Sequence, residues 1–196
     1  TTAVLNEAEY LESHNYLTLN NRGEYNDSGG IGYSRELPAP DFDGRHVRLK
    51  DLWGFGVAQE FSLVGAAQHE EFLLNYQLRL LERYGLNAYG CCEPYTHKYD
   101  MLSKIPRMRR VSVSPWSDIR VAAERLGEHC IFSWKPNPAL LVGEFREDLI
   151  RRSIRQTLSV AQGCRLEIIL KDTITVNYEP ARLDTWSRIA REEIGN

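Results

Sequence analysis

Short apolar runs alternate along the chain with longer segments in which apolar residues recur at helical spacing. The runs predict β-strands, because they are rich in aromatic and β-branched residues and end at polar or turn-forming residues. The helical segments begin at capping residues or prolines and stop near glycine or proline. The expected strands are 16–19, 55–62, the beginning of 86–94, 110–114, 130–135 and 166–170, and the expected helices are 5–14, 67–84, 96–104, 117–126, 145–162 and a last helix that opens at Pro180.

The regular alternation of strand and helix is typical of a parallel sheet. Each expected strand ends in polar or unusual residues, and one polar rim built from successive strand ends is a feature of (βα) barrels. A doubly wound sheet is less favoured, because no Gly-x-Gly-x-x-Gly follows the first strand. We therefore predict an α/β protein with a single domain over residues 1–196, in the form of a partial TIM-type (βα) barrel.

A full barrel needs eight strands and about 250 residues, whereas only six strands are expected here. The chain also does not begin with Met. We expect it to be the C-terminal part of a longer barrel, with two N-terminal βα units missing or supplied by another chain, such as a second copy. An isolated partial barrel would otherwise expose two unpaired sheet edges.

Three helices have patterns specific enough to predict which residues are buried. In 145–162 the expected inner face is formed by Leu149, Ile150, Ile154, Leu158 and Ala161. In 67–84 the expected inner face is formed by Phe72, Leu73, Tyr76, Leu80 and Leu81. In the last helix it is formed by Leu183, Trp186 and Ile189. A long loop, at about 20–50, contains glycines at 29, 30 and 32, and is either a surface excursion or a rim over a ligand site. It lacks the Gly-Lys-Ser/Thr ending of a phosphate loop.

The composition is that of an ordinary soluble protein, with a net charge of −3. This balance argues against a general nucleic-acid binder. We expect no membrane span, because no run of about 18 apolar residues occurs. The four cysteines are irregularly spaced, and the adjacent Cys91 and Cys92 are of a kind that rarely pair with each other, so a reducing cytoplasm fits best.

The most reactive strand end is 91–93, where two thiols are followed by a carboxylate. Zinc is one interpretation, with Glu60, one or both of Cys91 and Cys92, and either Asp172 or His97 as ligands. In the alternative, one cysteine is a small buried residue and the other lines a cavity, or one is a nucleophile that needs a base the sequence does not identify. Glu60 is the best candidate acid or base, unless it is paired with Lys135 or Lys171.

We therefore take Glu60, Cys91 and Asp172 as candidate catalytic residues. Other polar and aromatic residues at strand ends would bind a small-molecule substrate, and aromatic rings there would suit a flat ligand. These candidate substrate-binding residues are Asn20, Gln59, Tyr89, Trp116, Trp134, Lys135 and Lys171.

Several local segments, taken in order, carry a family resemblance. They are 20–33, Tyr89-Gly90-Cys91, 111–114, 133–138 followed by Leu140-Leu141, and 171–180. Together they resemble the uroporphyrinogen decarboxylase superfamily, which also contains corrinoid-dependent and coenzyme-M methyltransferases. The resemblance covers nearly the whole chain and matches the C-terminal two-thirds of a family barrel.

The resemblance implies methyl transfer to or from a corrinoid carried by a partner protein, with zinc as the cofactor of the zinc-dependent members, and alternatively decarboxylation of a porphyrinogen-like substrate. The chain departs from both patterns. Tyr89 stands where zinc-dependent members have a ligand histidine, and the last-strand cysteine or histidine position falls near Thr173. Only Cys91 matches a family zinc ligand. A non-catalytic barrel that binds a small ligand or a partner protein is therefore a third interpretation.

Overall fold

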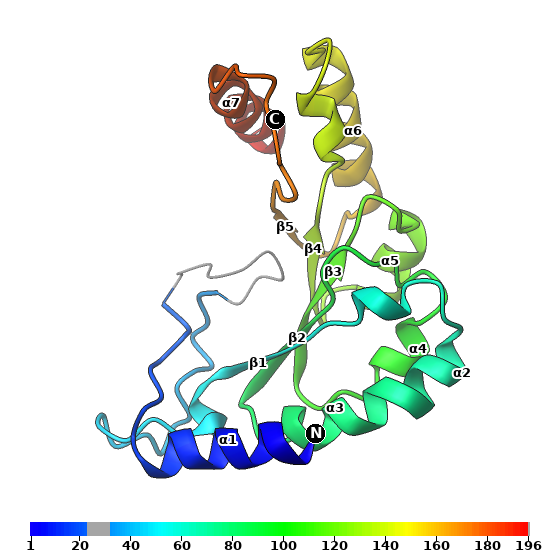
Figure 1. Ribbon diagram of the computed structural model, residues 1–196. Helices are drawn as coiled ribbons and strands as arrows, with labels where there is room; N and C mark the ends of the chain where they lie inside the picture. The colour runs from blue at the N-terminus through cyan, green and yellow to red at the C-terminus, as the bar shows by residue number, and fades with distance from the viewer. Residues whose placement is uncertain (23–31, 196) are drawn as a thin grey trace.

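The computed structural model describes residues 1–22 and 32–195, and its centre is a five-stranded parallel sheet (Figure 1). The strands are β1 (Trp53–Gly56), β2 (Leu86–Tyr89), β3 (Met108–Val113), β4 (Ile131–Trp134) and β5 (Arg165–Ile168). They lie in the order β1-β2-β3-β4-β5, so each strand pairs with the next strand along the chain. The predicted α/β class and parallel sheet are confirmed, and the order shows no reversal of the kind that a doubly wound sheet contains.

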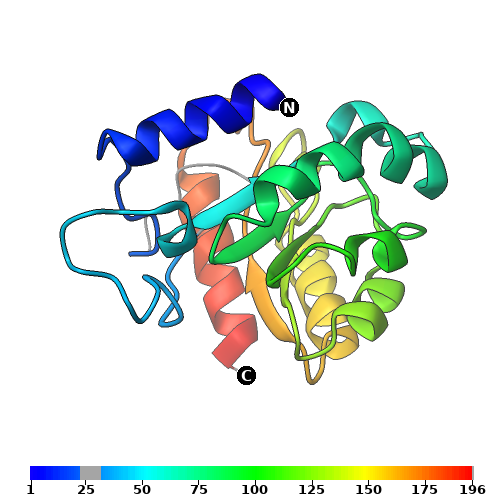
Figure 2. The ribbon, with the colours of Figure 1, turned by 90° about the horizontal axis from the view of Figure 1, so that it is seen from below.

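The helices follow one another around the outside of the sheet (Figure 2). They are α1 (Thr2–Ser13), α2 (Ala66–His69), α3 (Asn75–Leu81), α4 (Tyr99–Leu102), α5 (Ile119–Leu126), α6 (Glu147–Val160) and α7 (Ala181–Gly195). Asp118 caps α5, since its Oδ1 accepts hydrogen bonds from the backbone N–H groups of Arg120 and Val121 at 2.9 and 3.3 Å. No helix in these described residues is long and apolar enough to cross a membrane.

Alternation along the strands gives the sheet two different faces. Toward the helices it presents Tyr89, Val111 and Phe132, which are buried in the main core with Leu81 and Ile150. Toward the other side it presents the buried polar residues Arg110, Ser112 and Ser133 and the partly buried Glu167, with the buried Lys135 just beyond β4. Burial of the charged groups among them requires partners.

Two of the expected strands differ from the structure. Residues 16–19 form no strand, and the side chain of Asn20 instead pairs with the backbone of Trp53, donating to its carbonyl at 3.1 Å and accepting from its N–H at 2.9 Å. β1 ends at Gly56, and a 3₁₀ turn over Gln59–Phe61 replaces the second half of the expected strand. The first of these differences makes the prediction of six strands wrong, and the second shortens a strand that is present.

The expected inner face of 67–84 is also wrong in part. Phe72 and Tyr76 are 61% and 51% exposed, whereas Leu74 and Leu81 are buried. A π-helical turn over Glu70–Leu74 separates α2 from α3, and its wider turn rotates the buried side relative to a regular 3.6-residue period. In α7, Trp186 and Ile189 are buried as expected, but Leu183 is 39% exposed.

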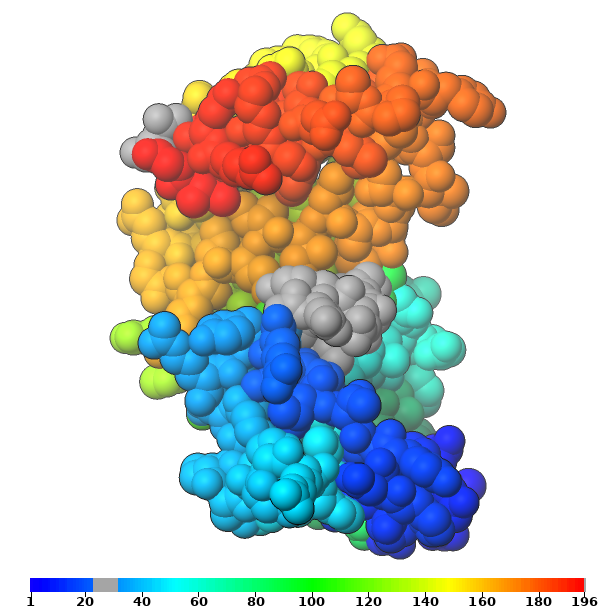
Figure 3. All heavy atoms as spheres, turned by 90° about the vertical axis from the view of Figure 1, so that its left-hand side faces the viewer, coloured from blue at the N-terminus to red at the C-terminus, as the bar shows by residue number. Residues whose placement is uncertain are grey.

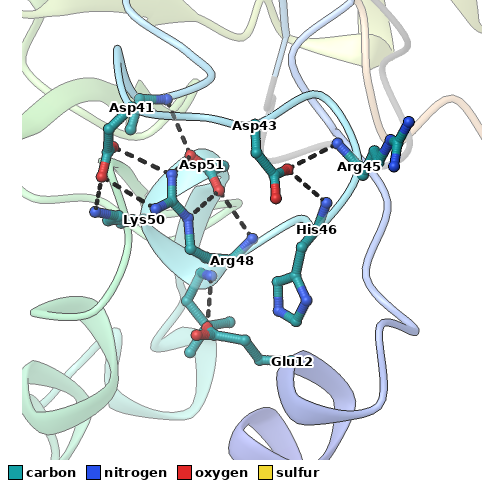
Figure 4. A network of polar contacts seen from close by, with 10 residues as sticks. Glu12, Asp41, Asp43, Arg45, His46, Arg48, Lys50 and Asp51 are labelled. Carbon is teal, nitrogen blue, oxygen red and sulfur yellow. Dashed lines mark hydrogen bonds and ion pairs between the residues drawn. The ribbon is translucent and has the colours of Figure 1, made fainter.

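The described part of the long loop is anchored beside β1 by a polar network (Figure 4). Asp51 has no exposed surface and accepts hydrogen bonds from Ala39 N and from the backbone and guanidinium of Arg48, at 2.9 to 3.1 Å. Glu12 of α1 accepts a bond from Leu49 N at 2.8 Å, and Asp41 pairs with both Arg48 and Lys50. These contacts join α1, the loop and β1 at one end of the molecule, opposite α7 (Figure 3). Residues 23–31, which include Gly29 and Gly30, lie outside the described residues.

Candidate functional site

The two adjacent thiols follow a tight turn at the carboxyl end of β2. Gly90 has a φ of +92°, and a Cβ at this position would lie 2.5 Å from the ring of Tyr95. Glycine is therefore required both by the backbone conformation and by the packing. The turn brings the Cys91 carbonyl to the inner side of the sheet, where the hydroxyl of Ser112 donates to it at 2.7 Å.

Five polar side chains meet at this point, and we call them the thiol cluster. The Lys171 ammonium lies 2.9 Å from Cys91 Sγ and 3.1 Å from Cys92 Sγ. Gln59 Nε2 donates to Cys92 Sγ at 2.9 Å, and the Cys92 thiol donates to Asp172 Oδ2 at 3.2 Å. The two sulfurs are 3.6 Å apart. The turn after β1, the turn after β2 and the segment after β5 thus contribute to one centre.

The position of Lys171 shows that the sheet is strongly curved. Neighbouring strands lie about 4.8 Å apart, so in a flat sheet β2 and β5 would be separated by about 14 Å. Lys171 follows β5, yet its Nζ contacts both sulfurs that follow β2. A second contact across the inner face, between Arg110 of β3 and Glu167 of β5, passes over β4 at 2.5 Å. The carboxyl ends of non-adjacent strands therefore converge.

Charge and burial shift the pKa values within the thiol cluster. Burial alone would lower the pKa of the Lys171 ammonium, but its contacts with the two sulfurs outweigh burial and raise it. Burial raises the pKa of Cys92 to about 11, with Asp172 and Cys91 acting in the same direction and Lys171 in the opposite one. At neutral pH Cys92 is therefore a thiol that donates to Asp172, beside an ammonium that would stabilise the thiolate once the proton has left.

Glu93 organises the turn that carries the thiols. Its buried carboxylate accepts hydrogen bonds from Ala58 N at 2.8 Å, from Cys91 N at 3.0 Å and from the Tyr95 hydroxyl. It therefore ties the turn after β1 to the turn after β2. Sequence reasoning treated Glu93 only as a third polar residue after the thiols and assigned it no role. The sequence signal that could have indicated its structural role is its position, directly between two reactive residues and a proline.

A buried chain of polar groups crosses the inner face next to the thiol cluster. Arg110 Nη2 contacts Glu167 Oε2 at 2.5 Å, the Ser133 hydroxyl donates to Glu167 Oε1, and the Lys135 ammonium donates to that same hydroxyl and to the Ser133 carbonyl. Lys135 has no exposed surface. Burial lowers its pKa to about 8, Glu167 opposes this effect, and the charges of Lys171 and Arg110 add to it.

The lowered pKa of Lys135 predicts a pH-dependent stability. Between pH 8 and about 10.4 the unfolded chain keeps a proton on this lysine that the folded chain has lost, so the free energy of unfolding rises with pH across that range. The contribution amounts to about 3 kcal/mol. The free energies of unfolding in urea of the wild type and of Lys135→Met should therefore differ by an amount that changes between about pH 7 and about pH 10. Lys104→Met, at a half-exposed surface lysine, is the matched control. If the free energies of unfolding of the wild type and of Lys135→Met changed in parallel with pH, this would contradict a lowered pKa of Lys135.

Two adjoining hollows open beside the thiol cluster. One, of about 350 Å³, is lined by Gln59, Cys92, Glu93, Pro94, Trp116 and Leu63 with Ser62. The other, of about 550 Å³, shares Leu63, Pro94 and Trp116 and extends to His97, Lys98 and Asp118. Trp116 is 70% exposed and Leu63 is 98% exposed. A small molecule in the first hollow would therefore meet an apolar wall and the Cys92 thiol.

The structure brings some of the residues singled out from the sequence together and separates others. Cys91, Cys92, Gln59, Lys171 and Asp172 form the thiol cluster, Trp116 lines both hollows, and Lys135 lies in the buried chain next to them.

The remaining candidates lie elsewhere. Asn20 lies at the amino end of β1, and the buried Tyr89 faces the helices, where its hydroxyl donates to Gln77 Oε1 at 2.5 Å and lies 3.1 Å from His69 Nε2. Trp134 is buried in the main core. Glu60 is exposed on the 3₁₀ turn, and within the described residues no hydrogen bond or ion pair joins it to the thiols.

Zinc fits these side chains poorly as they are arranged. Zinc sites need three or four sulfur, nitrogen or oxygen donors around one point. Among residues 1–22 and 32–195, no three His, Cys, Asp or Glu side chains are grouped in that way. The Lys171 ammonium, itself a cation, lies in contact with both sulfurs, where a metal ion would have to bind. We therefore derive no step through zinc.

The chain was compared with family models, curated proteins and solved structures, and none of the three comparisons gives a match.

Proposed function

We propose that this chain is a thiol-dependent group-transfer enzyme with the architecture of a partial (βα) barrel, and that the transferred group is a methyl group exchanged with a corrinoid carrier. The barrel is supported by the sequential strand order, the helices that follow one another around the sheet and the convergence of the ends of β2 and β5. The choice of a methyl group from a corrinoid rests on the resemblance to the uroporphyrinogen decarboxylase superfamily.

The observation that carries the proposal is the contact of one ammonium group with two thiols at the carboxyl edge of a parallel sheet. Active sites of (βα) barrels lie at this edge. A cysteine becomes a nucleophile when a base takes its proton and a positive charge stabilises the thiolate. Asp172 is within hydrogen-bond distance of the Cys92 thiol, and Lys171 supplies the charge. Asp172 also has a φ of +55°, an uncommon conformation that clusters at functional sites.

The proposed step is a methyl transfer to sulfur. The Cys92 proton passes to Asp172, and the Cys92 thiolate attacks the methyl carbon of a methyl-corrinoid that acts as the substrate. A carbon–sulfur bond forms and the carbon–cobalt bond breaks, and its electron pair leaves with the cobalt, which passes from Co(III) to Co(I). Lys171 and Gln59 donate hydrogen bonds to the sulfur, which lines the hollow.

Incubation with methylcobalamin tests this step directly. We expect the spectrum of the corrinoid to change to that of Co(I) under anaerobic conditions, and the peptide that contains Cys91 and Cys92 to gain the mass of one CH₂. Cys92→Ser should abolish both changes. Cys130→Ser, at a cysteine outside the cluster, should leave them intact. A wild-type chain that leaves methylcobalamin unchanged would refute the methyl-transfer proposal.

Decarboxylation of a porphyrinogen-like substrate is the second candidate, and the buried cations favour it. Lys135 and Lys171 follow β4 and β5 at the carboxyl edge, and Arg110 lies deeper on β3, where its charge acts on Lys135. Such groups are suited to holding substrate carboxylates. Release of CO₂ from a porphyrinogen by the wild type, but not by Lys171→Met, would select this function over methyl transfer. Binding of a porphyrinogen or a corrinoid without turnover would instead select the third interpretation, a non-catalytic binding domain.

A further inference from the structure

The two thiols of the cluster are close enough to react with each other. Cys91 Sγ and Cys92 Sγ are 3.6 Å apart, and both cysteines are reduced. We infer that Cys91 and Cys92 form a reversible disulfide between neighbouring residues when the protein meets a small-molecule disulfide. This modification is independent of the proposed methyl transfer and requires no corrinoid.

Access to solvent favours the reaction at Cys92, and two hydrogen-bond donors stabilise its thiolate once the proton has left. Cys92 lines the hollow of about 350 Å³ that opens to solvent beside Trp116, so a small disulfide can reach its sulfur. The Lys171 ammonium contacts both sulfurs and therefore stabilises whichever one carries the negative charge. Gln59 adds a second donor to Cys92. Within residues 1–22 and 32–195, no hydrogen bond is donated to the sulfur of Cys130 or Cys164, and each thiol donates to a backbone carbonyl, that of Met108 and that of Ala123.

The exchange balances in two steps. The Cys92 thiolate attacks one sulfur of the small disulfide, a mixed disulfide forms on Cys92, and one small thiolate leaves. The Cys91 thiolate then attacks Cys92 Sγ, the Cys91–Cys92 bond forms, and the second small thiolate leaves. Both small thiolates take up the protons that the two cysteines have lost. The two cysteines are oxidised, and the small disulfide is reduced to two thiols.

The short spacing makes the bond easy to reverse. Bridged cysteines usually have Cα atoms 4.4 to 6.8 Å apart, whereas neighbouring residues are held about 3.8 Å apart by the peptide unit. A disulfide between neighbours is therefore strained, and strained disulfides are the more readily reduced ones. This explains why such pairs are rarely found bridged, although their sulfurs lie side by side here.

The experiment uses the whole chain, oxidised glutathione as the probe, and mass spectrometry after acid quenching. We expect the wild type to lose the mass of two hydrogens, with the change confined to the peptide that contains Cys91 and Cys92, and dithiothreitol to restore the original mass. Cys91→Ser should instead retain one glutathione on Cys92, because the second attack is missing. Cys130→Ser and Cys164→Ser should behave as the wild type.

Three outcomes would overturn the inference. One is a wild-type chain that accumulates glutathione on Cys92 without losing hydrogens. Another is a disulfide that involves Cys130 or Cys164. The third is a wild-type mass that does not change while a free dithiol in the same solution is oxidised. Phenylarsine oxide, which needs two neighbouring thiols, gives a second measurement. It should bind the reduced wild type, and prior treatment with oxidised glutathione should block that binding.

Discussion

Lys171→Met should lower the rate of methyl transfer from methylcobalamin by on the order of 10²-fold, the typical cost of removing one preorganised donor from a reacting centre. Lys171 is the only one of the five cluster residues that contributes a positive charge, and it donates to both sulfurs. Methionine keeps much of the length of the side chain but stabilises no thiolate. The change should therefore act on the chemical step and leave the fold intact.

Two measurements separate this effect from a structural one. The rate at which iodoacetamide alkylates the Cys91–Cys92 peptide should fall in Lys171→Met, because the thiolate and not the thiol is alkylated. The urea midpoint should remain close to that of the wild type. Lys50→Met, at a half-exposed lysine that pairs with Asp41, is the matched control and should react at the wild-type rate. Unchanged alkylation and unchanged transfer in Lys171→Met would show that this ammonium does not activate the thiols.

Glu93→Ala should destabilise the protein by about 3 kcal/mol or more. The substitution leaves two buried backbone N–H groups, of Ala58 and Cys91, and the buried hydroxyl of Tyr95 without their acceptor. Each unpaired buried group costs about 1 to 3 kcal/mol. Because these bonds join the turns after β1 and β2, alkylation of Cys91 and Cys92 should also lose its selectivity over Cys130 in the folded protein.

Urea unfolding compares this variant with three others. Glu93→Gln keeps an acceptor oxygen and should cost less than the alanine variant, and Tyr95→Phe should cost least, because it removes only one of the three bonds. Glu128→Ala, at an exposed glutamate, should be near neutral. If Glu93→Ala were as stable as Glu128→Ala, the carboxylate would not hold the turns together.

Strand positions were predictable where the apolar run was short and bounded by turn residues. β2, β3, β4 and β5 lie within a few residues of the expected runs. The run at 16–19 has the same local composition, yet it is not a strand. The backbone N–H and carbonyl of Trp53 in β1 pair instead with the side-chain amide of Asn20. This is a tertiary contact that local composition does not encode.

The helix faces show a second limit. A regular period places Phe72 and Tyr76 inward, but a single π turn moves Leu74 inward and leaves both aromatic rings exposed. No residue in Glu70–Leu74 predicts a π turn, since this segment contains neither proline nor glycine.

The candidate site was predictable as a set of strand ends and not as a set of contacts. That Cys91, Cys92, Lys171 and Asp172 share one edge follows from parallel strands alone. Which of them touch depends on how strongly the sheet curves, and this depends on packing between distant segments. The role of Lys171 between the two sulfurs, and of Glu93 beneath them, therefore emerges only in three dimensions.

The pairing of Asn20 with Trp53 also bears on the edge of the sheet at β1. A free sheet edge is a template on which another chain can add a strand. The Asn20 carboxamide presents the same donor and acceptor as a peptide group, and it occupies both the N–H and the carbonyl of the first residue of β1. An incoming strand would have to displace this side chain before it could form its first backbone hydrogen bonds with β1. A single side chain thus blocks the addition of a further strand at the first residue of β1.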